Sequence, residues 1–307
     1  MYVGGLDGND GIIARVTFGT DGSIENIEPF SDTEGHPIDL YFDPDGNLLV
    51  ADWKRGLISI DPQGQITTLI APETIVEGKS FRRPDGIAVG PDGTIYFSEG
   101  SRRDGTWNGV YEALEQRSWG RLLALDRATG NVRVLIPELY FGNGVTLTPD
   151  GSAVLVADQY RYRIVRYWLQ GPHQRTYDFF AENLPGFVHN LHYDEAGILW
   201  AAIYQERSPV LDRFHPYPQI KNQLAKLPPA LLGARSGEVR SPDDRGAGLI
   251  VALNAEGKVL RRLENPPVAL NTLSTALPYK GALYIGTIEP GSSTVLRYPL
   301  PNLAVNE

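Results

Sequence analysis

One phrase recurs along this chain about every fifty residues: an alternating apolar stretch, a tight turn that contains glycine, and a β-rich run. Its clearest copies are IDLYFDPDGNLLVAD at 38–52, DGIAVGPDGTIYFSE at 85–99 and NGVTLTPDGSAVLVAD at 143–158. Weaker copies are HNLHYDEAGILWAAI at 189–203 and LSTALPYKGALYIGT at 273–287. This repeat predicts a modular fold, because each unit can bury its apolar residues only by packing against its neighbours.

A second hairpin follows each copy, so one unit should contain four antiparallel strands. The hairpin reads LISIDPQGQITTL around Gly64 and LLALDRATGNVRVL around Gly130, and a copy near the start of the chain surrounds Gly22. Counting the second hairpins gives six units. The sequence therefore predicts an all-β fold, a six-bladed β-propeller that residues 1–307 form as a single domain.

Blade 1 is expected to lack its innermost strand, because residues 2–6 have the pattern of its second strand. Two alternatives follow for the C-terminal PNLAVNE. It could supply the missing strand and close the ring, or it could be the outer strand of blade 6. We favour the second alternative, because it keeps the strands in chain order.

Two insertions interrupt the period, 100–119 in blade 3 and 204–247 in blade 5. In the second, Ile220, Leu224 and Leu227 recur at helical spacing, so short helices are expected there and in the first insertion. Insertions in repeat proteins tend to lie on the binding face. We therefore expect a lid over one mouth of the channel and a small, partly hydrophobic substrate beneath it. The lid residues expected to touch that substrate are Trp107, Tyr111 and Phe214.

Charge and cysteine content argue against several classes of function. The formal net charge is −9 and no run of Lys and Arg is present, which is unlike proteins that bind nucleic-acid backbones. The absence of cysteine excludes disulfide scaffolds, zinc sites with thiolate ligands, iron–sulfur clusters and cysteine nucleophiles. No signal peptide is visible in MYVGGLDGND, and no apolar run has the roughly 18 residues of a membrane span. We expect a soluble protein, cytoplasmic by default, that is a monomer or a dimer.

Three polar residues are expected to converge on the central channel. The innermost strands of a propeller line that channel, so the residue eight positions before each turn glycine should point into it. In blades 3 to 5 this position holds Asp85, Asn143 and His189, whereas blades 2 and 6 have Ile38 and Leu273. One carboxylate, one amide and one imidazole could hold a divalent metal, either Ca²⁺ or a transition metal. They could equally form a polar channel without a metal, and both interpretations stay open.

Two longer stretches carry a family resemblance. GRLLALDRATGNVRVLIPELYFGNGVTLTPDGSAVLVAD at 120–158 and RSPVLDRFHPYP at 207–218 resemble the strictosidine synthase-like family, and the likeness extends from residue 36 onward. The resemblance implies wider kinship with the six-bladed calcium-dependent hydrolases, such as paraoxonases and the gluconolactonase and regucalcin proteins. A fold carries over among such kin, but an activity does not.

The resemblance also implies roles for single residues. It implies that the metal ligands of those hydrolases are a Glu from blade 1, an Asn from each of blades 3 and 4, and an Asp from blade 5. This chain keeps Asn143, has Asp85 in place of the other Asn and His189 in place of the Asp, and has no counterpart of the Glu. His36 matches the position of a histidine in paraoxonases, and the resemblance implies that this histidine is the base for lactone hydrolysis. Ser274 stands where strictosidine synthase has its catalytic Glu, so that enzyme's own reaction is not expected.

Three functions follow as hypotheses. The leading one is hydrolysis of a lactone or ester, in which Asp85, Asn143 and His189 bind a metal or polarise the carbonyl and His36 or His189 is the base. The second is a metal-independent condensation, cyclisation or isomerisation, with His189 and Asp85 as the acid–base pair. The third is a ligand-binding propeller without catalysis. The residues expected to line the substrate site share polar or aromatic side chains near the channel: Asn143, Asn190, Asn271, Ser274, Trp107, Tyr111 and Phe214.

Overall fold

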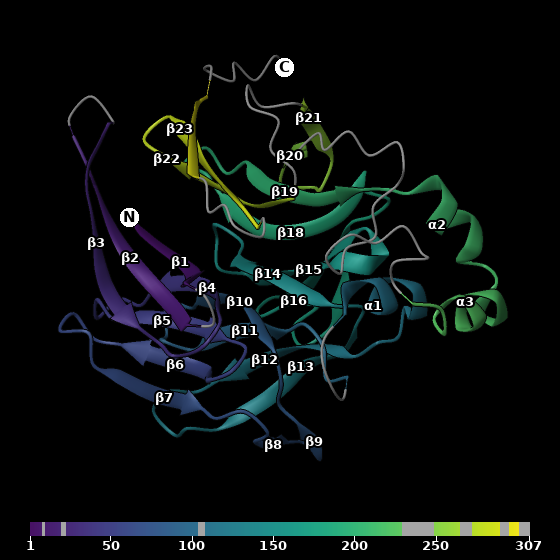
Figure 1. The fold of residues 1–307 in the computed structure, drawn as a ribbon, viewed down its shortest axis with the longest axis horizontal. Helices are drawn as coiled ribbons and strands as arrows, with labels where there is room; N and C mark the ends of the chain where they lie inside the picture. The colour runs from purple at the N-terminus through teal and green to yellow at the C-terminus, as the bar shows by residue number, and fades with distance from the viewer. Residues whose placement is uncertain are drawn as a thin grey trace. The chain divides into compact units, whose positions relative to one another are not determined.

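The computed structural model describes residues 1–7, 10–19, 23–103, 108–228, 249–264, 272–288 and 295–300. The strands form the six blades of a β-propeller, which confirms the fold class predicted from the repeat (Figure 1). By internal packing the chain divides into two compact units, and the single domain stays a prediction. Unit 1 contains Met1–Arg102, Gly120–Val156 and Tyr167–Thr176, and unit 2 contains Arg103–Trp119, Ala157–Arg166 and Tyr177–Glu307.

Blades 2 to 5 are four-stranded sheets whose strands follow chain order. Blade 2 has β4 (Pro37–Phe42), β5 (Leu48–Asp52), β6 (Gly56–Ile60) and β7 (Ile66–Ile70), and blade 3 has β10 (Pro84–Val89), β11 (Ile95–Glu99), β12 (Gly120–Leu125) and β13 (Val132–Leu139). Blade 4 has β14 (Gly142–Leu147), β15 (Ala153–Asp158), β16 (Arg163–Trp168) and β17 (Tyr177–Ala181), and blade 5 has β18 (Gly186–Tyr193), β19 (Leu199–Glu206), β20 (Leu249–Leu253) and β21 (Val259–Glu264).

Blades 1 and 6 each show three strands among the described residues. Blade 1 has β1 (Tyr2–Asp7), β2 (Asp10–Phe18) and β3 (Ile24–Asp32), and blade 6 has β22 (Leu273–Tyr279), β23 (Ala282–Thr287) and β24 (Val295–Pro299). Strand β1 is at the edge of its sheet and lies against β4. The C-terminal PNLAVNE, for which two positions were weighed, lies outside the described residues.

The repeated turn has a local cause. At the tip of the β4–β5 hairpin, Gly46 adopts a φ of 86° and its N–H donates to the Asp43 carbonyl at 3.1 Å. A left-handed φ of this kind favours glycine, because glycine lacks a Cβ. The Asp43 carboxylate accepts the Asn47 N–H at 2.8 Å, which closes the turn. Gly93 repeats this geometry in blade 3, with a φ of 81°.

Apolar residues are buried between neighbouring blades within each unit. In unit 1, one cluster joins blades 2 and 3 and includes Leu57, Phe81 and Phe97. In unit 2, Trp200 of β19 is fully buried in a cluster that joins blades 5 and 6. Its indole N–H donates to Asp194 Oδ2 at 2.8 Å, so the buried ring leaves no polar atom unsatisfied.

Both insertions contain short helices, as predicted. Blade 3 carries α1 (Gly109–Glu115), and blade 5 carries α2 (Pro209–Phe214) and α3 (Pro218–Leu224). Asn108 caps α1 by accepting the N–H groups of its first turn, and Ser208 caps α2 in the same way. Within the part of the chain that the structure describes, none of the helices has the length and apolar character needed to cross a membrane.

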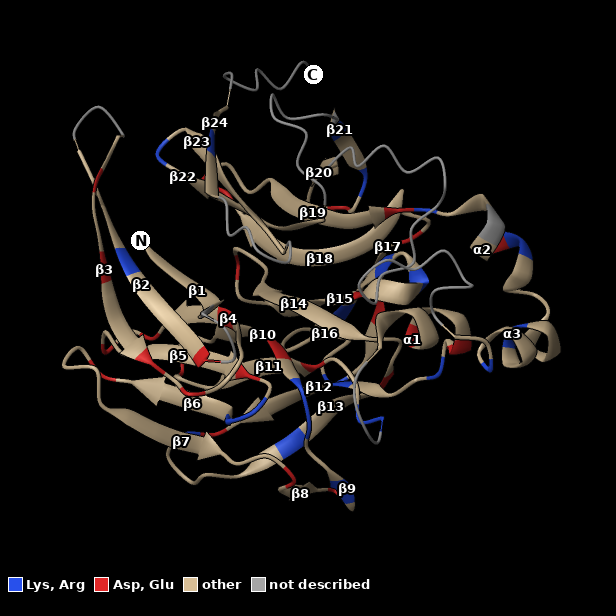
Figure 2. Cartoon of the chain, viewed as in Figure 1, with Lys and Arg blue, Asp and Glu red and all other residues tan. Residues whose placement is uncertain are grey.

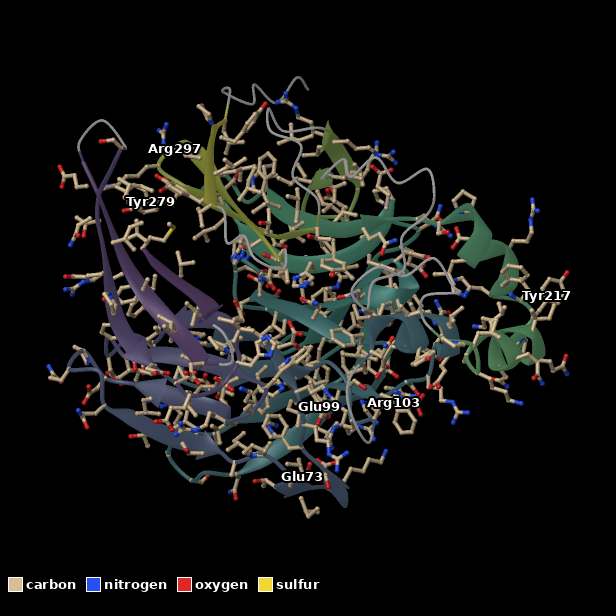
Figure 3. All side chains as sticks on the ribbon, in the orientation of Figure 1. Glu73, Glu99, Arg103, Tyr217, Tyr279 and Arg297 are labelled. Atoms are coloured by element: carbon tan, nitrogen blue, oxygen red, sulfur yellow. The ribbon has the colours of Figure 1, made fainter. Side chains whose placement is uncertain are left out.

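A buried carboxylate ends the second strand in three blades. Asp52, Glu99 and Asp158 are all fully buried, and Figure 3 shows Glu99 among the packed side chains of unit 1. Acidic residues elsewhere gather in turns and at strand ends (Figure 2). Glu99 Oε2 receives the Arg121 Nε–H at 2.6 Å, and its Oε1 receives the Arg82 backbone N–H at 2.6 Å. Two fully buried charges are stable only when they are paired in this way.

Removing the cation of this pair should destabilise the protein strongly. Arg121→Met leaves the Glu99 charge buried with Arg102 at 3.5 Å as its remaining cation, and we expect a loss of about 3 kcal/mol in the free energy of unfolding. Urea denaturation measures this loss. The matched control is Arg15→Met, which breaks the exposed pair with Glu28 and should leave stability nearly unchanged. Equal effects of the two substitutions would contradict the prediction.

Candidate functional site

The innermost strands of four blades contain a bulge, at which their pairing with the second strand shifts. The shifts lie between Pro37 and Asp39, Pro84 and Ile87, Val188 and Leu191, and Leu273 and Thr275. A bulge leaves an extra residue outside the ladder and re-aims its side chain. Asp85, His189 and Ser274 all lie within these bulges, which is why polar side chains leave the alternation of the strand at these positions.

Asp85 of β10 is almost completely buried in unit 1. It is 2% exposed, and its Oδ1 has no hydrogen-bond partner. At the next residue, Gly86, strand β10 lies very close to β14. A Cβ atom at Gly86 would be only 2.4 Å from the Val145 nitrogen. Only glycine fits there, and Asp85 is therefore held against the neighbouring blade.

Asn143 lies on β14, beside the strand that carries Asp85. Ser98 joins the two strands: its Oγ accepts the Gly86 N–H at 2.8 Å and donates to the Asn143 carbonyl at 2.6 Å. Asn143 is buried, and its side-chain Oδ1 accepts the Gly144 N–H at 2.8 Å. The structure thus brings the strands of Asp85 and Asn143 together.

Sequence reasoning missed Asp39, which follows Ile38 in the bulge of β4. Its Oδ2 accepts the Ile87 N–H at 2.9 Å, so this carboxyl group crosses from blade 2 to the strand that carries Asp85. Counting eight positions from the turn glycine selected Ile38, the residue that the register shift of β4 skips, whereas Asp39 is paired with Ala51. The sequence did contain one signal, because Asp39 is an acidic residue directly after Ile38.

The two carboxyl groups of unit 1 share an unusual environment. Burial raises the pKa of Asp39 to about 6, although the Ile87 and Leu40 N–H groups act in the opposite direction. Burial, and then the nearby Asp39, raise the pKa of Asp85 well above its usual range. Two close carboxyl groups in a poorly solvated place cannot both ionise easily. The neutral form of the Asp85 carboxyl group is therefore favoured.

His36 lies in the loop that leads into β4 and is half-buried. The buried Asp52 carboxylate fixes this loop by accepting the His36 N–H and the Thr33 hydroxyl, at 2.8 and 2.9 Å. The imidazole lies 5.2 Å from the Trp53 ring, measured between centroids. Burial lowers the His36 pKa, the Asp52 charge raises it, and the charge of Lys54 lowers it further. His36 is thus held in place as a mainly neutral imidazole.

His189 is the buried imidazole of unit 2. It lies in the bulge of β18, is 7% exposed, and packs its ring 5.5 Å from that of Tyr204. Its Nδ1 is buried and has no hydrogen-bond partner among the residues that the structure describes. Burial lowers the His189 pKa to about 4, although the Ser274 carbonyl and the Asn190 side chain act in the opposite direction. The ring is therefore neutral at pH 7 and able to accept a proton.

Polar residues surround His189 within the same unit. Asn190 follows it in the chain, is 8% exposed, and has a buried Oδ1 without a partner. Ser274 is half-buried on β22. His192 Nε2 lies 2.9 Å from Thr275 Oγ1, a contact that joins β18 to β22 and makes His192 a packing residue. The convergence of His189 with Asp85 and Asn143, which belong to unit 1, stays a prediction.

The predicted lid residues are described in part. Tyr111 of α1 is half-buried, and its hydroxyl donates to the Leu227 carbonyl beyond α3 at 3.1 Å. Phe214 is half-buried at the end of α2. Trp107 and Asn271 lie outside the described residues. The helices of both insertions therefore contact one another in unit 2, and their role as a lid stays a prediction.

The donor set expected for a metal was tested against this geometry. Among the residues that the structure describes, no group of three or more His, Asp or Glu side chains is placed to hold a metal ion. In unit 1, the Asn143 oxygen is already bonded to a backbone N–H, and Asp85 lies where its neutral form is favoured. Asp85 and Asn143 belong to unit 1 and His189 belongs to unit 2, so a divalent metal held by all three stays a prediction.

The chain is similar to known proteins in sequence and in fold. The family model for strictosidine synthase matches residues 85–172. Two solved structures share the fold: a gluconolactonase from Xanthomonas campestris (TM-score 0.62, 15% identity, 95% of this chain and 82% of that one), and the calcium-binding protein regucalcin from Agrobacterium tumefaciens (TM-score 0.53, 14% identity, 92% and 80%). At such identities the likeness concerns the fold alone.

Relatives with higher identity cover most of this chain. Protein STRICTOSIDINE SYNTHASE-LIKE 13 of Arabidopsis thaliana is 33% identical over 268 residues, 87% of this chain and 62% of the relative. The chain spans about half the length of two further plant relatives, at 52% and 51%. The adipocyte plasma membrane-associated protein of Rattus norvegicus is 30% identical over 304 residues, 94% of this chain and 77% of the relative. With its repeat, its blades and these relatives, the chain belongs to the strictosidine synthase-like family.

Proposed function

We propose that the protein hydrolyses a lactone or ester of a small, partly hydrophobic molecule, with His189 as the general base. The observation that carries the proposal is the buried, neutral imidazole in the bulge of β18, with a pKa near 4 and an amide side chain beside it. His189 differs from His192 on the same strand in that its Nδ1 has no hydrogen-bond partner among the described residues. An imidazole of this kind can accept a proton throughout the physiological pH range.

The proposed reaction needs one proton transfer in each direction. The imidazole of His189 takes a proton from water as the water oxygen attacks the carbonyl carbon. The Asn190 amide, which has two N–H donors, would stabilise the negative charge that develops on the carbonyl oxygen. The C–O bond of the ester then breaks, and the leaving alkoxide takes up a proton. The imidazolium of His189 supplies that proton and returns to its neutral form.

A second candidate uses the same groups without water as a reactant. An isomerisation or a cyclisation needs a base, which the neutral imidazole of His189 would supply. Ser274 in place of the family's catalytic Glu argues against the amine–aldehyde condensation itself. Turnover in H₂¹⁸O separates the two candidates, because only hydrolysis places the heavy oxygen in the carboxylate product.

Substituting the base should abolish hydrolysis. We expect His189→Gln to lower kcat/KM by about 10²- to 10⁴-fold on any lactone or aryl ester that the wild type turns over, because glutamine cannot accept a proton from water. His173→Gln, in the exposed turn after β16, is the matched control and should keep full activity. The assay is run after chelation and again with Ca²⁺, Mn²⁺ or Zn²⁺ added. Full activity of His189→Gln, or no turnover on a broad panel under all conditions, would refute the proposal.

The pH–rate profile should identify the base. The reaction needs neutral imidazole, which predominates above the pKa, so kcat/KM should fall only below about pH 4 to 5 and be level up to pH 8. The His36 pKa is also lowered, but Asp52 opposes that shift. An acid limb near pH 6 that disappears in His36→Gln would therefore assign the base to His36.

The carboxyl pair predicts a pH dependence of stability. The folded pKa values of Asp39 and Asp85 are raised above the unfolded value of 3.8. The contribution of the two neutral carboxyl groups to the free energy of unfolding is therefore present below about pH 4 and is lost as the pH rises through 6. Asp85→Asn should be more stable than the wild type at pH 8 and lose less stability between pH 5 and pH 8, as urea denaturation would measure. Asp61→Asn, in a turn of the same unit, should change neither. Equal destabilisation by Asp85→Asn at both pH values would show that Asp85 is ionised.

A further inference from the structure

The innermost pair of strands in blade 5, β18 and β19, has one more bulge than the corresponding pairs of three other blades. In blades 2, 3 and 6 the pairing of the described residues shifts once. In blade 5 one shift lies between Val188 and Leu191, the stretch that contains His189. A second shift, in the opposite direction, lies between Phe187 and Val188. The strands therefore return to their original register, and the effect of the two bulges is to re-aim side chains.

The second bulge adds Tyr204 to β19. Along this strand the pairing passes from Gln205 directly to Ile203. Their partners on β18, Phe187 and Val188, are adjacent in the chain. Because a bulge interrupts the alternation of a strand, it changes the direction of the side chain that it adds. Tyr204 is thus re-aimed on β19, just as the proposed base is re-aimed on β18.

The two re-aimed side chains lie against each other. The centroids of the Tyr204 and His189 rings are 5.5 Å apart, and the ring planes are inclined by 32°. His189 is 7% exposed and Tyr204 is half-buried. Both rings belong to unit 2, on strands that are paired side by side (Figure 1). The buried imidazole therefore has an aromatic ring as its neighbour.

Among the described residues, no charged side chain acts on His189. The influences on its pKa are burial, a carbonyl group and an amide side chain. The elements packed against β18 include β19, β22 and the 3₁₀ helix η1 (Gln159–Arg161). Their charged residues are Glu206, exposed at the end of β19, and Arg161, and neither is among these influences. The Tyr204 ring is therefore placed to respond to a charge on the imidazole.

An imidazole that accepts a proton becomes a cation, and burying a cation without compensation is costly. The face of a tyrosine ring carries partial negative charge, and it attracts a cation that lies within about 6 Å of the ring centroid. The separation of 5.5 Å between Tyr204 and His189 meets this condition. The attraction is much weaker for a neutral imidazole, so it acts chiefly after His189 has taken the proton. An interaction that appears during a reaction raises kcat more than it affects substrate binding.

We propose that Tyr204 is a positioning residue for His189: its ring orients the imidazole and stabilises the imidazolium that forms when the imidazole takes a proton. The carboxylate beside the histidine of a Ser–His–Asp triad has the same two tasks. The pairing of the rings stands on the geometry of blade 5 alone. Its consequence for catalysis rests on the proposed hydrolysis, in which His189 takes a proton from water and returns it to the leaving group.

The first measurement reads the protonation of His189 directly and needs no turnover. The whole purified chain is labelled with ¹⁵N-histidine, and the His189 signals are assigned with His189→Gln. At about pH 4.5, a pKa of about 4 leaves about a quarter of the His189 rings charged in the wild type. Tyr204→Leu should lower this fraction at least twofold, because leucine fills apolar space but has no π face. Tyr204→Phe keeps the ring and should keep the fraction.

Two controls separate the ring from the fold. Tyr193→Leu makes the same substitution in another half-buried tyrosine of blade 5 and should leave the charged fraction of His189 unchanged. Pentafluorophenylalanine in place of Tyr204 keeps the shape of the ring but reverses the charge of its face. It should therefore lower the charged fraction as Tyr204→Leu does, and it gives a result even where leucine disturbs the bulge.

A kinetic test follows for any lactone or ester that the wild type hydrolyses. Tyr204→Leu should lower kcat by about tenfold and leave KM within about twofold, whereas Tyr204→Phe and Tyr193→Leu should match the wild type. Failure of the wild type to hydrolyse any substrate refutes the proposed function, and the NMR measurement still decides the role of Tyr204.

Three results would overturn the inference. One is an equal charged fraction of His189 in the wild type and in both replacements that remove the negative ring face. Another is a larger fraction in Tyr204→Leu, because it would show that the ring merely shields the imidazole from water. The third is a higher KM with unchanged kcat in Tyr204→Leu, which would make Tyr204 a substrate contact and not a positioning residue.

Discussion

The bond between a buried carboxylate and the loop that leads into the innermost strand supports much of this structure. In blade 2, Asp52 at the end of β5 accepts the backbone N–H of His36, and in blade 3, Glu99 at the end of β11 accepts that of Arg82. In both blades the innermost strand begins within two residues of that bond. A buried charge costs several kcal/mol unless it is fully paired, so each loop can take only the position that satisfies its carboxylate. The start of each inner strand is fixed in this way.

The bulges that follow determine the chemistry of the candidate site. Regular alternation would place every second residue of an inner strand on one face, whereas a bulge re-aims one side chain. Asp39, Asp85 and His189 occupy such positions and are enclosed by protein, so their pKa values move toward the neutral form. The same burial therefore yields a carboxylic acid in one unit and an unprotonated imidazole in the other. Acid and base result from a single physical cause, desolvation.

This chain shares its fold with known propellers but differs from the expected site residues at a few positions. Solved structures with 15% identity or less share the propeller with this chain, while Ser274 and His189 depart from the residues that the resemblance led us to expect. The inserted helices add a further difference, because they bring Gln116 and His215 into contact outside the blades. A propeller tolerates such changes, since its stability lies in the apolar contacts between blades and not in the residues of the bulges or insertions.

Local pattern in the sequence was enough to predict the blades, the turn glycines and the short inserted helices, because each depends on residues close together in the chain. It also selected Asp85, Asn143 and His189 by counting from those glycines. The count missed Asp39, since its carboxyl group matters through a bond to Ile87 on the neighbouring blade. The Glu99–Arg121 pair and the contact of Gln116 with His215 were equally invisible in the sequence. Burial and the pairing of distant charges arise only when separate segments pack together, and the tertiary structure alone reveals them.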